Sequence, residues 1–336
     1  MASSSPKIDK VKRIDVHTHI MFPGEEGGKY ADLMPRLARD EAGQEVIQVR
    51  GRSFRGQMEL HNPKRRIQDM DKKGIDMQVL SIMPVFIFYD VDPEFGIACS
   101  QIQNNAIAAI VKTYPDRFVG LATVPLHVPL AAAKELKRAM NELGMKGVQI
   151  LSDVNEKNLD WPELWPFYET AQELGAFILC HPKAFSVMDR MKKFHLQNLV
   201  GHPFDTSLAI ASVIFGGVLR DFPKLKLCFL HGGGFAPYQR GRFEHGYQVR
   251  LECKEMISKP PSEYFKLLHF DTVTHYDPAL EYLIRTVGSD KVLMGSDYPA
   301  DMADPDPVAT LSRLEPIPSA DKENIFGKNA ARLLGL

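Results

Sequence analysis

Eight short segments of the chain are mostly apolar, and stretches with helical spacing of apolar residues separate most of them. An apolar run of this length is typical of a strand that is buried on both faces. The predicted strands are 13–20, 77–84, 118–125, 147–153, 176–182, 225–234, 268–275 and 292–299. The predicted helices are 62–74, 93–114, 129–144, 161–175, 205–220, 277–288 and 320–334.

The regular alternation of strand and helix predicts an α/β fold with parallel strands that close into a (β/α)8 TIM-like barrel. A doubly wound open sheet is the competing architecture, but no glycine fingerprint of the Rossmann type follows the first strand. Residues 21–61 do not fit the repeat and contain EVIQVRGRSFR, which predicts a small β-hairpin insertion over the barrel mouth. Residues 235–262 are a second irregular stretch, rich in Arg, Tyr and Phe. Because no low-complexity linker divides the chain, we expect a single domain over residues 1–336.

Composition narrows the functional classes. The 336 residues include 41 basic and 42 acidic side chains, so the basic surplus typical of nucleic-acid binders is absent. No apolar stretch reaches the roughly 18 residues of a membrane span, and the N-terminus lacks the apolar core of a signal peptide. The 4 cysteines form no CxxC pair, which favours free thiols in a reducing compartment. We therefore expect a cytoplasmic enzyme with neither membrane nor nucleic acid as partner.

Polar side chains with metal-binding chemistry stand where the predicted strands end. The first strand carries His17 and His19, and residues two apart in a strand point the same way. Two imidazoles on one face can hold a transition metal, although the motif alone also fits a pair of polar strand-end histidines. The fifth, sixth and eighth strands end at His181, His231 and Asp297. Their convergence on one rim of a barrel predicts a metal site.

These residues resemble the pattern of the amidohydrolase superfamily. The match spans nearly the whole chain and is nearest to the branch of aminocarboxymuconate-semialdehyde, γ-resorcylate and 5-carboxyvanillate decarboxylases. It rests on Asp15-x-His17-x-His19, His181, His231 and Asp297, and on the stretches 66–76, 114–126, 217–234 and 294–299. The resemblance implies one divalent ion, Zn²⁺ or Mn²⁺, held by His17, His19, His181 and Asp297. It implies an acid/base role for His231, for which the alternative is a structural histidine at a glycine-rich turn. Residues 147–153 contain no lysine to bridge two metals, which argues for a single ion.

The resemblance also implies substrate-binding residues. Arg55 and Arg242 match arginines that hold a substrate carboxylate, and the second of these comes from a neighbouring subunit, which implies a homodimer or a higher homo-oligomer. Lys183 stands where a tryptophan follows the His-Pro pair in the aminocarboxymuconate enzyme. This departure puts that substrate in doubt and suggests a second anionic or phenolic oxygen. Phe88 either walls an aromatic ring or packs in the core. Asp271 or His275 could face the pocket, whereas we expect His202 to shape a loop.

The leading functional hypothesis is non-oxidative decarboxylation of a small unsaturated or (hydroxy)aromatic carboxylic acid. A metal beside the carboxylate would act as the electron sink, and either His231 or Asp297 would return a proton to the carbon. The first alternative is hydrolysis of a small ester, lactone or amide by a metal-activated water. A hydratase and a non-catalytic metal-binding protein are the others. The arginines favour decarboxylation because an acid substrate needs an anchor for its anion.

Overall fold

Eight parallel strands form the centre of the protein in the computed structural model, which describes residues 12–22, 35–49, 52–55, 61–183 and 188–336. Strands β1 (Ile14–Ile20), β5 (Met77–Ile82) and β6 (Phe118–Gly120) form one sheet in the order β1-β5-β6. A second sheet has the order β13-β12-β11-β10-β7, with β7 (Gly147–Leu151), β10 (Phe177–His181), β11 (Lys226–Phe229), β12 (His269–Asp271) and β13 (Val292–Leu293). The prediction of an α/β fold with parallel strands is confirmed.

The edges of the two sheets face each other at both ends. An isolated parallel bridge joins Ala122, just after β6, to Val148 of β7, and another joins Thr18 of β1 to Tyr298, just after β13. A backbone hydrogen bond lies next to the second bridge, where the amide of Asp297 donates to the carbonyl of His17 over 2.8 Å. Each end strand of one sheet therefore has a backbone neighbour from the other sheet.

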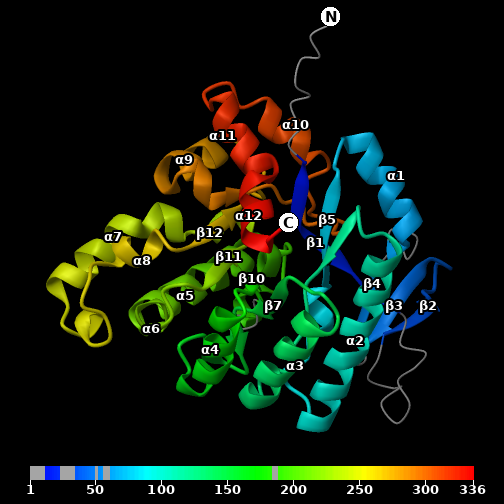
Figure 1. The fold of residues 1–336 in the computed structure, drawn as a ribbon, viewed down its shortest axis with the longest axis horizontal. Helices are drawn as coiled ribbons and strands as arrows, with labels where there is room; N and C mark the ends of the chain where they lie inside the picture. Colours follow the sequence, from blue (N-terminus) through cyan, green and yellow to red (C-terminus); the bar gives the residue numbers. More distant parts are fainter. Residues whose placement is uncertain (1–11, 23–34, 50–51, 56–60, 184–187) are drawn as a thin grey trace, which may run out of the picture.

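Helices surround these strands (Figure 1). They are α1 (Pro63–Lys73), α2 (Pro93–Thr113), α3 (Pro129–Asn141), α4 (Trp165–Glu173), α5 (His202–Phe215), α6 (Val218–Asp221), α7 (Ala236–Val249), α8 (Pro261–Phe265), α9 (Asp277–Val287), α10 (Pro307–Ser312), α11 (Ser319–Glu323) and α12 (Asn329–Leu334). Many start with proline in the first turn, where a missing N–H is tolerated. In α1 the Asn62 side chain accepts from the amide of Lys64, and Gly74 ends the helix at a φ of 68°.

The core divides into two apolar clusters. The larger one fills the space between the strands and the helices around them. The smaller one combines residues from the first halves of several strands with α12 of the C-terminus, among them Ile14, Val16, Leu179 and Leu333. Helix α12 thus packs against the strands in the smaller cluster, and the polar side chains described below stand near the C-terminal ends of the strands.

The irregular stretches of the sequence have their own structure. Strands β3 (Glu45–Val49) and β4 (Arg52–Arg55) pair antiparallel, and β2 (Arg36–Arg39) adds a third strand that the sequence did not predict. Residues 235–262 form α7 and α8, which project on the side of the molecule opposite to β2 and β3 in Figure 1. The predicted helix at 320–334 is interrupted by a π-helical turn, Asn324–Lys328. The start of α5 is three residues earlier than predicted.

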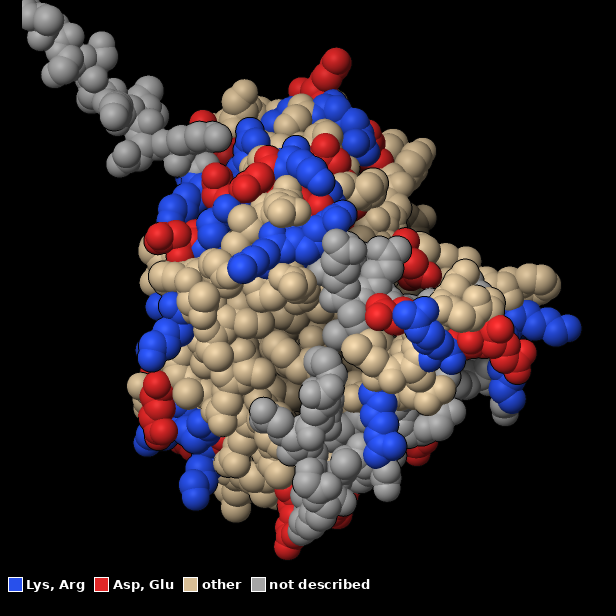
Figure 2. Space-filling view, turned by 90° about the vertical axis from the view of Figure 1, so that its right-hand side faces the viewer, with Lys and Arg blue, Asp and Glu red and all other residues tan. Residues whose placement is uncertain are grey.

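Charges of both signs lie interspersed on the face shown in Figure 2, and neither forms a continuous patch there. A broad uncharged area lies below them on the same face. Within the described residues, every helix is too short or too polar to cross a bilayer.

Candidate metal centre

Two histidines from the first strand face each other at the C-terminal end of the central strands. Strand β1 is fully buried, and His17 and His19 lie two residues apart on it, with their Nε2 atoms 3.2 Å from each other. The pairing of β1 with β5 shifts by one residue between Asp15 and Thr18. Such a bulge re-aims the side chains that follow it and is frequent beside active sites. The sequence pattern predicted the shared face but not the bulge.

His181 and Asp297 complete a group with these two histidines. One ligand atom from each of the four residues lies within 4.8 Å of all the others, and all four residues are buried. Asp297 Oδ1 lies 3.2 Å from His17 Nε2 and 3.1 Å from His19 Nε2. Metal–ligand bonds of about 2.0–2.1 Å in a tetrahedral site place neighbouring ligand atoms about 3.3 Å apart. The group could therefore hold one metal ion, and it contains the four residues that the sequence predicted.

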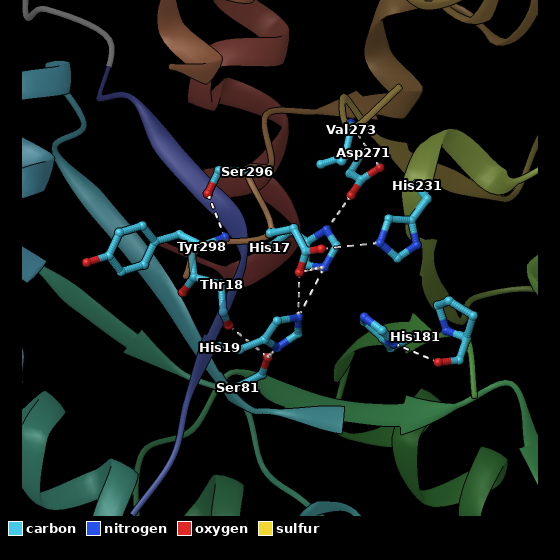
Figure 3. A network of polar contacts seen from close by, with 12 residues as sticks. His17, Thr18, His19, Ser81, His181, His231, Asp271, Val273, Ser296 and Tyr298 are labelled. Carbon is cyan, nitrogen blue, oxygen red and sulfur yellow. Dashed lines mark hydrogen bonds and ion pairs between the residues drawn. The ribbon is translucent and has the colours of Figure 1, made fainter. Parts of the chain in front are cut away.

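The other ring nitrogen of each histidine is tied down (Figure 3). His17 Nδ1 lies 2.6 Å from Asp271 Oδ2, and His19 Nδ1 lies 3.2 Å from Ser81 Oγ. His181 Nδ1 lies 2.8 Å from the carbonyl of Pro182. A proton donated from each Nδ1 leaves the Nε2 lone pair directed at the centre, which is how proteins orient metal-binding imidazoles. The donor set thus fits a divalent ion such as Zn²⁺ or Mn²⁺.

The pKa values of the four side chains follow from burial and from their mutual contacts. Burial lowers the pKa of His19 to about 4 and holds the pKa of His181 well below its usual range. Burial would also lower the pKa of His17, but Asp297 and Asp271 raise it to about 10. Burial would raise the pKa of Asp297, but His17 and its neighbours hold it well below normal. Asp297 is therefore ionised at neutral pH, as a metal-binding carboxylate must be.

A buried polar network supports the centre from behind. Asp15 accepts from the Ser296 hydroxyl over 2.6 Å and from the Ser296 amide over 3.0 Å, which fixes the residue before Asp297 against β1. Burial raises the pKa of Asp15 to about 6, although the bond from Ser296 opposes this shift. Arg66 is fully buried and donates to the carbonyl of His19 over 2.8 Å. The strand segments that carry the ligands are thus joined through side chains as well as through the backbone.

His231 stands beside the group of four, at the end of β11. Its Nε2 lies 3.6 Å from Asp297 Oδ2, and its ring centroid is 5.1 Å from that of His17 and 5.2 Å from that of His181. It has a φ of 54°, and the three glycines after it also have positive φ. Non-glycine residues held in this region cluster at functional sites. Among the described residues nothing hydrogen-bonds to His231 Nδ1.

The proposed substrate-binding residues are less tightly gathered. Lys183 follows the His181-Pro182 pair, and its Nζ lies 3.5 Å from Asp153 Oδ1. Phe88 is buried and packs 5.7 Å from the ring of Phe95. Arg242 is exposed on α7. Arg55 ends β4 opposite Val46, but its side chain lies outside the described part of the protein.

Two cavities meet at the centre. The larger, of about 1010 Å³, is lined by His19, His181, Lys183 and Phe88 among others. The smaller, of about 520 Å³, is lined by His231, His275 and several aromatic residues. Asn198, His202 and Asp297 line both, whereas Arg242 lines neither.

Sequence reasoning missed the places of two site residues. Asp271 lines neither of the two cavities described above; it is fully buried behind His17 and also accepts from the amide of Gly232 over 2.8 Å. His202 does not shape a loop, because it is the first residue of α5 and lies between the two cavities. Burial lowers the pKa of His202 to about 4. The His-Pro pair at 202–203 was the only sequence signal for this residue, and it does not distinguish a helix start from a loop.

A family model described as amidohydrolase matches residues 14–336. The chain belongs to this amidohydrolase family. A 2-amino-3-carboxymuconate-6-semialdehyde decarboxylase of Dictyostelium discoideum is 37% identical over 330 residues, covering 96% of this chain and 92% of that protein. A γ-resorcylate decarboxylase of a Polaromonas species is 28% identical over 291 residues, covering 81% of this chain and 87% of that protein.

The fold has counterparts among solved structures. One is a dihydroxybenzoic acid decarboxylase from Polaromonas, solved with bound manganese and the inhibitor 2-nitroresorcinol. The comparison with it gives a TM-score of 0.80 and 23% sequence identity, and the matched residues cover 97% of this chain and 98% of the decarboxylase chain. The fourth of the central strands, β7, reads Gly-Val-Gln-Ile-Leu and contains no lysine. Gln149 occupies the middle of that strand and donates to the carbonyl of Ile82 over 2.7 Å.

Proposed function

We propose that this amidohydrolase is a metal-dependent, non-oxidative decarboxylase of a small unsaturated or (hydroxy)aromatic carboxylic acid. The observation that carries the proposal is the position of His231. It is a histidine outside the group of four, with Nε2 3.6 Å from Asp297 Oδ2, and it lines the smaller cavity. The named activities of the relatives from Dictyostelium and Polaromonas support the reaction class over hydrolysis.

One divalent ion, Zn²⁺ or Mn²⁺, would be held by His17, His19, His181 and Asp297. When bound, it supplies Lewis acidity to a hydroxyl or keto oxygen that neighbours the carboxylate of the substrate. Asp271, Ser81 and the Pro182 carbonyl hold the three imidazoles in the tautomer that such an ion needs.

The protein's own side chains have three tasks in the reaction. Arg55, Arg242 and Lys183 hold anionic oxygens of the acid, because arginine binds carboxylates with two parallel hydrogen bonds. Phe88 forms part of the wall against the substrate ring. The bond from the carbon to its carboxylate breaks, CO₂ leaves, and the electron pair stays on the carbon. His231 then delivers a proton from Nε2 to that carbon. Asp297 is the alternative donor, but it would first have to take up a proton because it is ionised at neutral pH.

The fold proposal follows from the strand order and the two bridging contacts. We infer that the two parallel sheets are parts of one closed (β/α)8 barrel in a single domain, with residues 21–61 inserted over its mouth. The 4 free cysteines, 3 of them buried, support a reducing location, for which we propose the cytoplasm.

We further infer a homodimer or a higher homo-oligomer in which Arg242 of one protomer reaches the cavity of another. Arg242 is exposed and lines neither described cavity, while Tyr238 and Tyr276 at the rim of the smaller cavity are 75% and 66% exposed. Mixing two inactive variants, Arg242→Ala and His231→Asn, tests this arrangement. In a mixed dimer, one site has His231 from the Arg242→Ala protomer and Arg242 from the His231→Asn protomer. That site is intact, so activity returns on mixing. A fully active monomer, or full activity of Arg242→Ala alone, refutes the shared site.

Release of CO₂ from the metal-loaded protein tests the reaction class. The panel comprises 2,6-dihydroxybenzoate, hydroxypicolinates and aminocarboxymuconate semialdehyde, with esters, lactones and amides measured in parallel. We expect CO₂ from at least one acid and its loss in His231→Asn. Turnover of an ester or lactone without any CO₂ release would assign the chain to the hydrolases instead.

A further inference from the structure

A histidine outside the group of four lies where the two cavities share lining residues. His202 lines both of them, and its ring centroid is 6.0 Å from that of His181 and 6.0 Å from that of His231. A ligand at the centre that extends into either cavity can therefore meet this ring. The position belongs neither to the four predicted metal ligands nor to the predicted acid/base residue.

The backbone before His202 is unusual. Residues Gln197–Gly201 form a single π-helical turn, and the amide of His202 donates to the carbonyl of Gln197. Single π turns are rare and frequently occur at functional sites, because the extra residue changes the direction of the side chains that follow. Helix α5 then starts directly at His202.

A close backbone contact fixes the position of His202 relative to His231. A Cβ atom on Gly234 would lie 2.1 Å from the carbonyl oxygen of Pro203, so only glycine allows this approach. The Ser207 hydroxyl bridges the same elements, since it donates to the Pro203 carbonyl over 2.8 Å and accepts from the Phe235 amide over 2.7 Å. The first turn of α5 and the glycine turn after His231 are thus packed as one unit.

The hydrogen-bonding capacity of the His202 ring is unused. Each of His17, His19 and His181 has a hydrogen-bonded Nδ1, whereas no described residue hydrogen-bonds to the ring of His202. Because the ring lines both cavities, its nitrogens can meet a ligand there. Imidazole can donate at one nitrogen and accept at the other, which matches a hydroxyl group on a bound ring.

We propose that His202 is a specificity-determining residue that hydrogen-bonds to a hydroxyl group next to the substrate oxygen held at the metal centre. The assignment rests on the proposed function, because it takes the ligand to be an aromatic or unsaturated acid bound at that centre. It makes the preferred substrate a ring with polar substituents on both sides of the reacting carbon, and it separates such acids from those with a single hydroxyl.

Binding of two unreactive analogues tests this assignment. The manganese-loaded protein is titrated calorimetrically with 2-nitroresorcinol and with 2-nitrophenol, which lacks the second hydroxyl. We expect the wild type to bind 2-nitroresorcinol at least about tenfold more tightly, as a buried hydrogen bond allows. In His202→Phe, which keeps an aromatic ring without nitrogens, the ratio falls to about twofold, the statistical advantage of a ligand with two equivalent orientations.

The matched control is His202→Gln, whose amide can both donate and accept. It restores most of the tenfold preference, and manganese content and thermal unfolding show that each variant is folded and loaded. A wild-type ratio near two, an unchanged ratio in His202→Phe, or no binding of either analogue by the wild type overturns the assignment.

Release of CO₂ is measured separately. If the wild type decarboxylates acids but the ratio is unaffected by His202→Phe, only the role of His202 fails; if no acid releases CO₂, the proposed function fails, and the binding ratio still reports on His202.

Discussion

Replacing Asp271 by asparagine is expected to weaken metal binding without removing any of the four predicted ligands. Asp271 and His17 are both fully buried, and their contact of 2.6 Å is short. The second oxygen of Asp271 accepts from the amides of Gly232 and Val273 over 2.8 and 3.3 Å. Burial would raise the pKa of this carboxyl group, but the bond to His17 lowers it, so the residue is charged at neutral pH.

An amide in this position has no good orientation. If its oxygen keeps the two backbone amides, its NH₂ group faces His17 Nδ1, and the imidazole proton must move to Nε2, where it blocks the ion. If it flips, two buried backbone donors lose their acceptor. A hydrogen bond to a charged group contributes about 1.5–3 kcal/mol, which corresponds to about 10–150-fold in affinity. Mutation of residues that orient metal ligands typically lowers metal affinity by about 10–100-fold, which agrees with this range.

The measurement is a competition titration of the metal-free protein with Mn²⁺ against a fluorescent chelator. The control is Asp277→Asn, which makes the same chemical change in an exposed carboxylate paired with Arg313 over 2.7 Å. We expect the control to bind Mn²⁺ like the wild type, with thermal unfolding monitored for all three proteins. Affinity of Asp271→Asn within twofold of the wild type would refute the tautomer reasoning.

Three further variants test other parts of the site. His181→Ala should lose most of its bound metal, and unchanged occupancy by elemental analysis would break the ligand assignment. His231→Asn should keep its metal yet lose about 10²–10⁴-fold in turnover, the usual contribution of a general acid or base; full activity removes His231 from the mechanism. Gly234→Ala should lower the free energy of unfolding by about 2–5 kcal/mol, because its φ of 62° and the Pro203 carbonyl both oppose a Cβ. Urea unfolding with an unchanged midpoint would contradict that packing.

The parallel strands and the convergence of the metal-binding residues could be predicted from the sequence. Apolar runs on both faces indicate buried parallel strands, and side chains at the C-terminal ends of such strands share one rim of the fold. These two rules bring His17, His19, His181, His231 and Asp297 to one rim, and the resemblance to the amidohydrolase superfamily implies which four of them would hold the ion. Strand β2 could not be predicted, because Arg36–Arg39 shows no apolar run and is mostly exposed. Its pairing with β3 is a tertiary contact rather than a local preference.

The place of Asp271 could not be predicted for a different reason. Strand β12 is buried at all of its positions, so its sequence does not indicate which side chains point inward. The direction depends on the register with β11 and β13, in which Phe270 pairs with Phe229 and Val292. A shift by one residue would turn Asp271 away from His17. The residue that orients a ligand is therefore specified by strand pairing, whereas the ligands themselves are specified by their position at the strand ends.

His202 illustrates the most general limit of the sequence pattern. Pro203 is compatible with a helix that begins at 202, but the preceding π turn requires a hydrogen bond between residues five apart, which no residue in 197–201 encodes on its own. Packing of Pro203 against Gly234 can stabilise that turn, and these two residues are 31 positions apart in the numbering. Local rules predict each helix or strand from its own sequence. Real proteins depart from these rules mainly at functional sites. His202 is thus singled out by the irregular turn before it and by its place at both cavities, and not by its residue type.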